Sequence, residues 1–188
     1  MFLNVNRTLS TKLASLKANI TQQTHSANIQ TIGRTKHKNF DGFVTDDLNA
    51  HMIIYTSDCL PIIGVNDHSQ FIIHAGWKGL LSGIIPNLVS HPLIKGTYDI
   101  FIAPHLDMKN FEVKSDFVEQ WSHIQDFDEF YKNNHFNASG YAKKQLAPIT
   151  NNIQISNLCT FDDTRFASYR RNGNLLLTNL TIHNITFD

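Results

Sequence analysis

Short apolar runs separated by polar turns dominate the middle of the chain. Three of these runs are rich in β-branched and aromatic residues, which favours strands, and they lie at residues 52–56, 61–65 and 71–74. Polar residues 66–69, of the types that form turns, separate the last two runs. The pattern predicts a buried hairpin, with Cys59 before one arm and His74 at the end of the other.

Helical spacing appears on both sides of this hairpin. Leu9, Leu13 and Leu16 predict a helix over 5–18, and the apolar residues between Leu80 and Leu88 predict a helix after a tight turn. Two further helices are expected at 117–124 and at 137–146, the second one N-capped by Asn137 or Ser139. Further strands are expected at 20–25, 98–104, 111–113, 153–155 and 166–169.

Strands and helices therefore alternate along the chain, but most connections between strands are short. This organisation favours an α+β fold with a mixed sheet over a doubly wound parallel fold. No internal repeat and no linker rich in Pro, Gly and Ser divides the sequence. We expect residues 1–188 to form one compact domain, with helices flanking the sheet.

Composition excludes several classes of protein. The 188 residues carry 16 Lys plus Arg and 16 Asp plus Glu, so the basic excess of a general nucleic-acid binder is absent. No apolar run approaches the roughly 20 residues that span a bilayer, and the N-terminus lacks the features of a signal peptide. Two cysteines are too few for a secreted disulfide scaffold. We expect a mature cytoplasmic protein that binds neither nucleic acid nor membrane.

Cys59 and His74 are the leading candidates for chemistry, because strand ends present side chains to pockets. A thiolate and an imidazole together suit either a metal site or a Cys–His nucleophile pair. Asp58 directly precedes Cys59, and a carboxylate is an unusual neighbour for a core cysteine. The alternative is structural: Cys59 as a small buried hydrophobe and His74 as a half-exposed residue.

Other candidates have weaker settings. His25 ends the strand expected at 20–25, and Cys159 has apolar neighbours typical of a structural cysteine. In His74–Gly79, Trp77 could stack on a flat ring and Lys78 could meet an anion, unless Trp77 lies in the core and Lys78 in water. Arg170 and Arg171 end the strand expected at 166–169, which would point them to opposite faces, so that one could bind an anion.

These motifs, taken in order, resemble the YfiH/DUF152 family of laccase-domain proteins, also described as polyphenol oxidases. The resemblance covers most of the chain, from about Asn6 to Gly173. It implies a compact α/β fold with a mixed sheet, grouped by fold with CNF1-like cysteine hydrolases. The motifs are Gln23–Ser26, Asp41–Thr45, Ser57–Pro61, His74–Gly79, Ala103–Pro104, Cys159–Thr160 and Ser168–Gly173.

The resemblance also implies a zinc site formed by His25, Cys59 and His74. Members of the family phosphorolyse adenosine, inosine, guanosine and methylthioadenosine and deaminate adenosine, so a purine nucleoside and phosphate are the expected partners. Two His and one Cys leave an open position on zinc, where an activated water could attack C6 of adenine. Phosphorolysis needs an anion site instead, which Arg170, Arg171 or Lys78 could supply. Asp58 could orient a ligand or move a proton.

The chain departs from the family pattern in three places. The family's opening segment has no counterpart before Asn6, its Gly-Arg after the double arginine is absent beyond Gly173, and its Gly-Pro-x-Ile reads Ala103–Leu106. We therefore expect an N-terminally short, divergent member, either a monomer or a homodimer.

Three alternatives to the zinc enzyme stay open at this stage. A metal-independent cysteine hydrolase or amidase would use Cys59 as nucleophile and His74 as base. A copper-dependent polyphenol oxidase would need copper at the same residues, although no His-x-His pair suits a multicopper centre. A catalytically inactive binding protein would keep only the fold.

Overall fold

The predicted hairpin lies at the centre of a six-stranded mixed sheet. The computed structural model describes residues 2–5, 18–33, 38–174 and 178–183. Strand β6 (Leu60–Val65) pairs antiparallel with β7 (Gln70–Ala75), and the backbone N–H of Asn66 donates to the carbonyl of Ser69 to close the turn.

The sheet has the order β11-β8-β6-β7-β4-β3. Its outer pairs, β11 with β8 and β3 with β4, are parallel, whereas the inner pairs are antiparallel. This combination confirms the predicted mixed sheet. The four strands outside the hairpin are β3 (Ile29–Thr31), β4 (Gly42–Thr45), β8 (Asp99–Ile102) and β11 (Asn152–Ile155).

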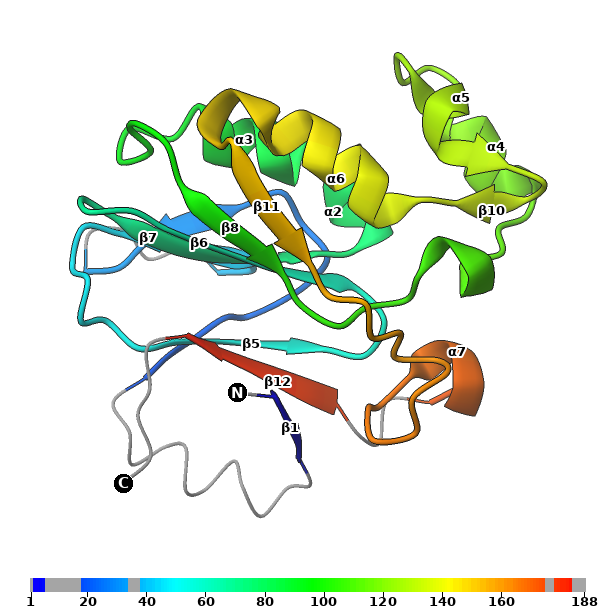
Figure 1. Ribbon diagram of the computed structural model, residues 1–188, viewed down its shortest axis with the longest axis horizontal. Helices are drawn as coiled ribbons and strands as arrows, with labels where there is room; N and C mark the ends of the chain where they lie inside the picture. Colours follow the sequence, from blue (N-terminus) through cyan, green and yellow to red (C-terminus); the bar gives the residue numbers. More distant parts are fainter. Residues whose placement is uncertain (1, 6–17, 34–37, 175–177, 184–188) are drawn as a thin grey trace.

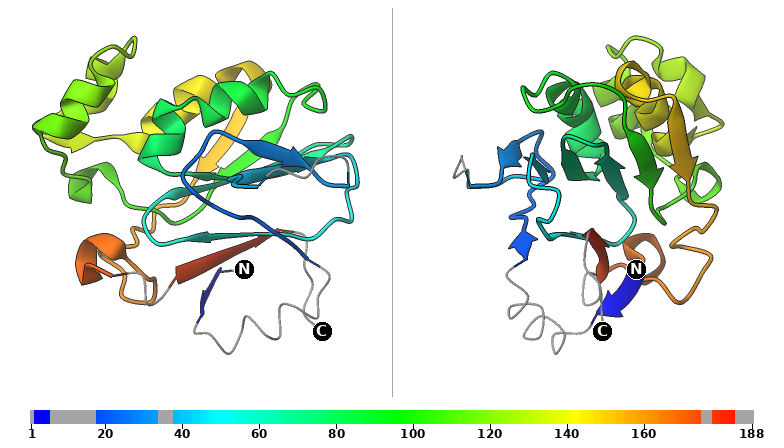
Figure 2. Two further views of the ribbon diagram at one scale, coloured as in Figure 1. Left: turned by 180° about the vertical axis from the view of Figure 1, so that it is seen from behind. Right: turned by 60° about the vertical axis from the view of Figure 1, so that its left-hand side comes forward.

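A second sheet of order β1-β12-β5-β2 packs beneath the first, as Figures 1 and 2 show. Met52 and Ile54 of β5 share a buried cluster with Ile72 of β7, whereas Ile53 faces the opposite side. Because both faces of β5 are buried, its sequence is continuously apolar rather than alternating. The strands are β1 (Phe2–Val5), β2 (Asn19–Ile20), β5 (Met52–Thr56) and β12 (Thr178–His183).

Helices cover the other face of the six-stranded sheet (Figure 1). Phe71 and Ile73 of β7 pack into the main core with residues of α2 (Trp77–Leu81), α3 (Ile84–Val89) and α6 (Ala138–Leu146). The predicted strand–turn–helix unit is therefore confirmed, but Gly83, with φ of 85°, divides its helix into α2 and α3.

An aromatic subcluster extends this core around Trp121. The rings of Phe117 and Trp121 stack with centroids 5.5 Å apart, and Phe136 lies 4.7 Å from Trp121. These rings hold the segment that links β8 to α6. Its elements are η1 (Met108–Asn110), α4 (Ser115–Trp121), α5 (Phe127–Phe130), β9 (Tyr131–Lys132) and β10 (His135–Phe136), and η2 (Ala147–Ile149) follows α6.

Three of the predicted strands are wrong. The segment 166–169 is loop and the start of α7 (Tyr169–Asn172), because the Ser168 hydroxyl accepts from the backbone N–H of Arg171 and caps a helical turn. The segment 111–113 follows η1 and forms a bridge only at Glu112. In the segment 20–25, strand β2 ends at Ile20 and only an isolated bridge between Gln22 and Phe40 follows, so the strand does not reach His25. The helix expected over 5–18 lies almost wholly outside the described residues.

Among the helices of the described ranges, none is long and apolar enough to cross a membrane.

The contacts at the start of α6 show which of the two predicted N-caps is correct. Asn137 Oδ1 accepts from the backbone N–H of Gly140 at 2.9 Å, whereas the Ser139 hydroxyl donates to Asn137 Oδ1 at 3.4 Å. Asn137→Ala should therefore lower the free energy of unfolding by about 1 kcal/mol, and Ser139→Ala should change it by less than about 0.5 kcal/mol. Urea denaturation of both variants measures this, and equal losses would contradict the assignment of Asn137 as the cap.

Candidate metal centre

Antiparallel pairing brings three polar residues to one end of the six-stranded sheet. Cys59 precedes β6 and His74 lies near the end of β7, and the β6–β7 register places Pro61 opposite His74. On the other side of β7, Asp41 precedes β4, and the backbone N–H of His74 donates to its carbonyl at 2.6 Å. The hairpin predicted from the sequence therefore brings Cys59 and His74 together.

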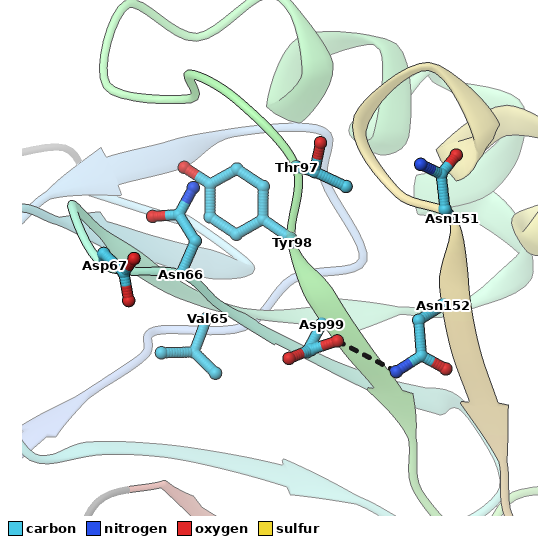
Figure 3. Close-up of a pocket in the computed structure, with 8 residues that line it drawn as sticks. All are labelled: Val65, Asn66, Asp67, Thr97, Tyr98, Asp99, Asn151 and Asn152. Carbon is cyan, nitrogen blue, oxygen red and sulfur yellow. Dashed lines mark hydrogen bonds between the residues drawn. The ribbon is translucent and has the colours of Figure 1, made fainter.

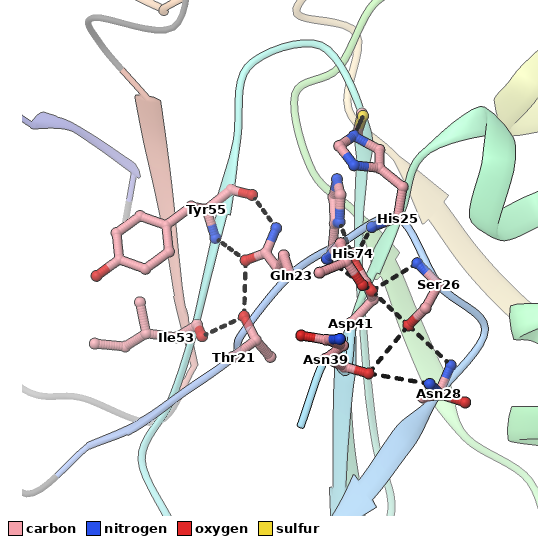
Figure 4. Close-up of polar contacts among 12 residues, drawn as sticks. Thr21, Gln23, His25, Ser26, Asn28, Asn39, Asp41, Ile53, Tyr55 and His74 are labelled. Atoms are coloured by element: carbon pink, nitrogen blue, oxygen red, sulfur yellow. Dashed lines mark hydrogen bonds and ion pairs between the residues drawn. The ribbon is translucent and has the colours of Figure 1, made fainter. Parts of the chain in front are cut away.

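His25 reaches the same place from the loop between β2 and β3. The side chain of Gln23 anchors this loop to β5, because it accepts from the backbone N–H of Tyr55 and donates to its carbonyl (Figure 4). The backbone N–H groups of Thr24, His25 and Ser26 all donate to the Asp41 carboxylate. These bonds hold His25 at a φ of 59°, a left-handed conformation that few side chains adopt.

The ligand atoms of His25, Cys59 and His74 lie within 4.8 Å of one another. Cys59 Sγ is 3.8 Å from His25 Nε2, and the two imidazole rings meet edge to face with centroids 4.7 Å apart. Two ligands of a tetrahedral zinc ion, one sulfur and one nitrogen, are separated by about 3.6 Å. The three side chains therefore fit a zinc ion with little movement.

Charged forms of Cys59, His74 and Asp41 are stabilised by one another, although burial opposes them. Burial alone would raise the pKa of Cys59, but His74 and His25 outweigh it and lower that pKa to about 6. Burial would likewise lower the pKa of His74, but the Cys59 thiolate and Asp41 outweigh it and raise that pKa to about 9. Hydrogen bonds from His74, Ser26 and Thr24 overcome the effect of burial on Asp41 and lower its pKa to about 2. A thiolate and an imidazolium therefore coexist at neutral pH.

Gly76 closes the back of the cluster and leaves no room for a side chain. A Cβ at this position would lie 2.6 Å from His25 Cδ2 and 3.0 Å from Cys59 Sγ. The glycine of the His74–Gly79 motif is therefore needed for the close approach of two candidate ligands.

A second group with suitable donor atoms, formed by Asp107, Cys159 and Asp162, has a different character. The side-chain amide of Asn110 donates to all three of these residues, at 3.0, 3.5 and 3.0 Å. The Asn110 amide nitrogen therefore lies among the acceptor atoms that would have to bind a cation. Together with the burial of Cys159, this arrangement agrees with the structural role predicted for that cysteine.

The structure places Asp58 beside the cluster with its carboxylate turned to another part of the chain. It accepts from the hydroxyl of Thr160 and from the backbone N–H of Arg170, both at 2.7 Å. Asp58 thereby ties the start of α7 to the strand that follows Cys59. A role of Asp58 in proton transfer stays a prediction.

The two arginines lie on α7 and not at the end of a strand, so the prediction that they point to opposite faces of a sheet is wrong. Arg171 donates to the carbonyls of Thr160, Phe161 and Phe166. The exposed Arg170 donates from one nitrogen to the carbonyl of Glu112. Most donors of Arg171 are therefore used within the fold, whereas Arg170 keeps donors for a ligand.

Trp77 and Lys78 follow Gly76 at the start of α2. Trp77 is half-buried against Phe117, with ring centroids 5.3 Å apart, and Lys78 is exposed with its Nζ 5.4 Å from the centre of the Trp77 ring. These positions fit the structural alternative, with Trp77 in the core and Lys78 in water, as well as they fit a role in substrate binding. Roles in substrate binding for both residues stay predictions.

A polar cavity of about 360 Å³ lies elsewhere, near the turn that follows β6 and the starts of β8 and β11 (Figure 3). Asp99 and Asn152 are hydrogen-bonded to each other at its edge. The cavity lies at the opposite end of β6 from Cys59 and contains none of the candidate ligands.

Asp41 is the residue that the sequence did not single out. It belongs to the Asp41–Thr45 motif, but a lone acidic residue before an apolar strand has many explanations. The signal that identifies it is the pairing of β4 with β7, which places Asp41 next to His74. That pairing cannot be read from local sequence.

Comparison with known proteins identifies the family. A family model described as multi-copper polyphenol oxidoreductase laccase matches residues 3–177. The chain belongs to the YfiH/DUF152 laccase-domain family. The resemblance identified from the motifs is therefore confirmed for nearly the whole chain.

Solved structures of this family share the fold. The protein YfiH of Bacillus licheniformis superposes with a TM-score of 0.78 at 22% identity, over 91% of this chain and 77% of that chain. A DUF152 protein of Neisseria meningitidis gives a TM-score of 0.74 at 20% identity, over 94% and 78% of the two chains. The predicted α/β fold with a mixed sheet is thus confirmed.

Curated relatives in the family are named purine nucleoside phosphorylases. The one from Campylobacter jejuni is 29% identical over 72% of this chain and 63% of its own length. The one from Haemophilus influenzae is 28% identical over 80% of this chain and 68% of its own length. The alignment with a Rickettsia prowazekii relative, 31% identical, spans 39% of this chain and 32% of that protein.

Gly76→Ala should disrupt the candidate metal centre without unfolding the protein, because the new Cβ would press on His25 and Cys59. We expect zinc affinity to fall by about 10-fold or more, measured by competition with a chromophoric chelator. Lys78→Ala, two residues away and exposed, is the matched control and should bind zinc as the wild type does. Unchanged zinc affinity in Gly76→Ala would contradict the ligand assignment.

The lowered pKa of Cys59 predicts unusual reactivity in the metal-free protein. Only the thiolate is alkylated, so the rate with iodoacetamide should rise through a midpoint near pH 6, where this thiol ionises, and level off above it. Mass spectrometry of the modified peptides follows the reaction, and the buried Cys159 in the same chain serves as the internal control. A midpoint near the ordinary thiol value of about 8.5 would show that His74 and His25 do not stabilise the thiolate.

Proposed function

We propose that this protein is a zinc-dependent purine nucleoside enzyme whose main reaction is phosphorolysis. The observation that supports this proposal most strongly is the cluster of His25, Cys59 and His74, which could offer three ligands to zinc. His25 is exposed, so a substrate could approach the metal from the side of this residue. The names of the curated relatives support a purine nucleoside and phosphate as substrates.

The donor set suits one zinc ion and argues against a multicopper centre. Three protein ligands that leave the fourth position open are the pattern of catalytic zinc sites. A multicopper oxidase would need several clusters of imidazoles, and in the described part of the chain only this group of three metal-ligating residues contains a histidine. A single copper ion could occupy the same ligands, so oxidation of phenols is the alternative that a metal assay must exclude.

In phosphorolysis, a phosphate oxygen forms a bond to C1′ of the ribose while the bond from C1′ to the purine nitrogen breaks. The base leaves with the electron pair of that bond and gains a proton. Zinc would supply Lewis-acid polarisation of a substrate atom. The chain itself must hold the phosphate, and Arg170 is the favoured residue because its guanidinium is exposed and Asp58 fixes its backbone beside Cys59.

Adenosine deamination is the second reaction that the proposed site would support. It needs an open position on zinc and a group that moves a proton, but no phosphate. Asp58 is the acidic residue next to Cys59 in the chain, although its carboxylate is engaged by Thr160 and Arg170. For this reason we place phosphorolysis first.

One observation favours a different class of enzyme. The Cys59 thiolate beside the His74 imidazolium has the charge state of a cysteine nucleophile and its base. A cysteine hydrolase of this kind would work without metal. Its activity would survive chelation and be abolished by alkylation, whereas the zinc enzyme would lose activity under both treatments.

The deciding experiment incubates zinc-loaded protein with adenosine, with and without phosphate, and separates the products by chromatography. Adenine and ribose 1-phosphate that appear only with phosphate are the expected result. Inosine formed without phosphate would make deamination the main reaction. Absence of every product from protein that holds zinc would overturn the proposal and favour a binding protein.

The same assay tests the phosphate site. Arg170→Ala should raise KM for phosphate by about 10-fold or more, because removing a charged hydrogen-bond donor costs about 1.5–3 kcal/mol, while stability stays unchanged. Arg165→Ala is the matched control, since this exposed arginine forms an ion pair with Asp163. A KM for phosphate that is the same in both variants would exclude Arg170 as the anion-binding residue.

A further inference from the structure

One buried carboxylate contacts both histidines of the candidate centre. The Asp41 side chain has no exposed surface, and it accepts hydrogen bonds from five donors. One donor is His74 Nδ1, and the other four belong to the loop segment that carries His25. We propose that Asp41 is the positioning residue of the metal centre, which sets the orientation of both histidine ligands; this inference rests on the zinc site proposed above.

On the His74 side, Asp41 selects the nitrogen that can bind metal. Asp41 Oδ1 lies 2.7 Å from His74 Nδ1, and an ionised carboxylate can only accept. Nδ1 must therefore carry the proton, which leaves Nε2 as the ligand atom. The backbone bond from His74 N–H to the Asp41 carbonyl fixes the two residues relative to each other.

On the His25 side, Asp41 acts through the backbone. Oδ1 accepts from His25 N–H at 2.9 Å, and Oδ2 accepts from the backbone N–H and the hydroxyl of Ser26, both at 2.7 Å. Convergence of successive N–H groups on one carboxylate stabilises the left-handed conformation of His25. That conformation directs the ring toward Gly76 and Cys59, where there is no space for an added methyl group.

Asparagine cannot replace this carboxylate, although it has the same shape. If its amide nitrogen took the place of Oδ1, it would face His74 Nδ1, and His74 could accept that bond only by moving its proton to Nε2. If the nitrogen took the place of Oδ2, it would face three donors of Thr24 and Ser26. The first arrangement blocks the ligand atom of His74, and the second releases the loop of His25.

The test compares Asp41→Asn with the wild type in a zinc competition assay that contains no nucleoside. We expect Asp41→Asn to bind zinc about 10- to 100-fold more weakly, the usual effect of losing a partner of a metal ligand. Asp99→Asn is the matched control, because Asp99 is hydrogen-bonded to Asn152 at the far end of the same sheet. Equal zinc affinity in Asp41→Asn and the wild type would overturn the inference.

A second measurement needs no variant and reports the tautomer directly. Long-range proton–nitrogen NMR of the zinc-loaded wild type should show His74 protonated at Nδ1, with a proton that exchanges slowly because the site is buried. A His74 bound to zinc through Nδ1 would contradict the inference even if Asp41→Asn failed to fold. A wild type that binds no zinc would instead overturn the proposed function, and the inference with it.

Discussion

The antiparallel register that β7 shares with β6 and with β4 brings Asp41, Cys59 and His74 to one end of the six-stranded sheet. Both faces of this sheet are covered, by helices above and by the second sheet below (Figures 1 and 2). A slip of one residue in either pairing would turn His74 to the opposite face of the sheet and exchange the side chains that β7 presents to the helices and to the second sheet. Core packing therefore fixes the site as firmly as any contact within it.

The site also requires ionised side chains at positions where burial disfavours the charged form. Cys59, His74 and Asp41 each lose hydration, and each is stabilised by the other two or by the loop around His25. The Cys59–His74 ion pair persists between about pH 6, below which the thiol is protonated, and about pH 9, above which His74 is neutral. Zinc would bind the neutral imidazole of His74, so metal binding is coupled to release of the imidazolium proton.

Local sequence predicted the strands that form the centre of the fold and the candidate residues Cys59 and His74 at their ends. The runs before and after residues 66–69 are apolar and separated by clear turn residues. Two buried strands joined by a turn are the simplest structure for such a pattern. The segment after Phe166 was misread as a strand because its aromatic residues favour one. The Ser168 cap and the carbonyl contacts of Arg171 decide its conformation instead. These contacts depend on the folded path of the chain, which strand propensity does not describe.

The role of Asp41 was beyond prediction for the same reason. His25 was assigned to the metal site only through the family resemblance, because nothing in its neighbourhood indicates a left-handed turn held by a carboxylate 16 residues away. Asp58 differs from Asp41, because its position beside Cys59 did suggest chemistry. Its contacts tie α7 to the sheet, and its role in proton transfer stays a prediction.

X-ray absorption spectroscopy of the zinc-loaded protein tests most directly the claim that one zinc ion binds His25, Cys59 and His74. We expect one zinc per chain with a single sulfur at about 2.3 Å and nitrogen or oxygen ligands at about 2.0–2.1 Å, and a zinc shell without sulfur in Cys59→Ser. A wild-type zinc shell without sulfur, or one that Cys59→Ser leaves unchanged, would contradict it.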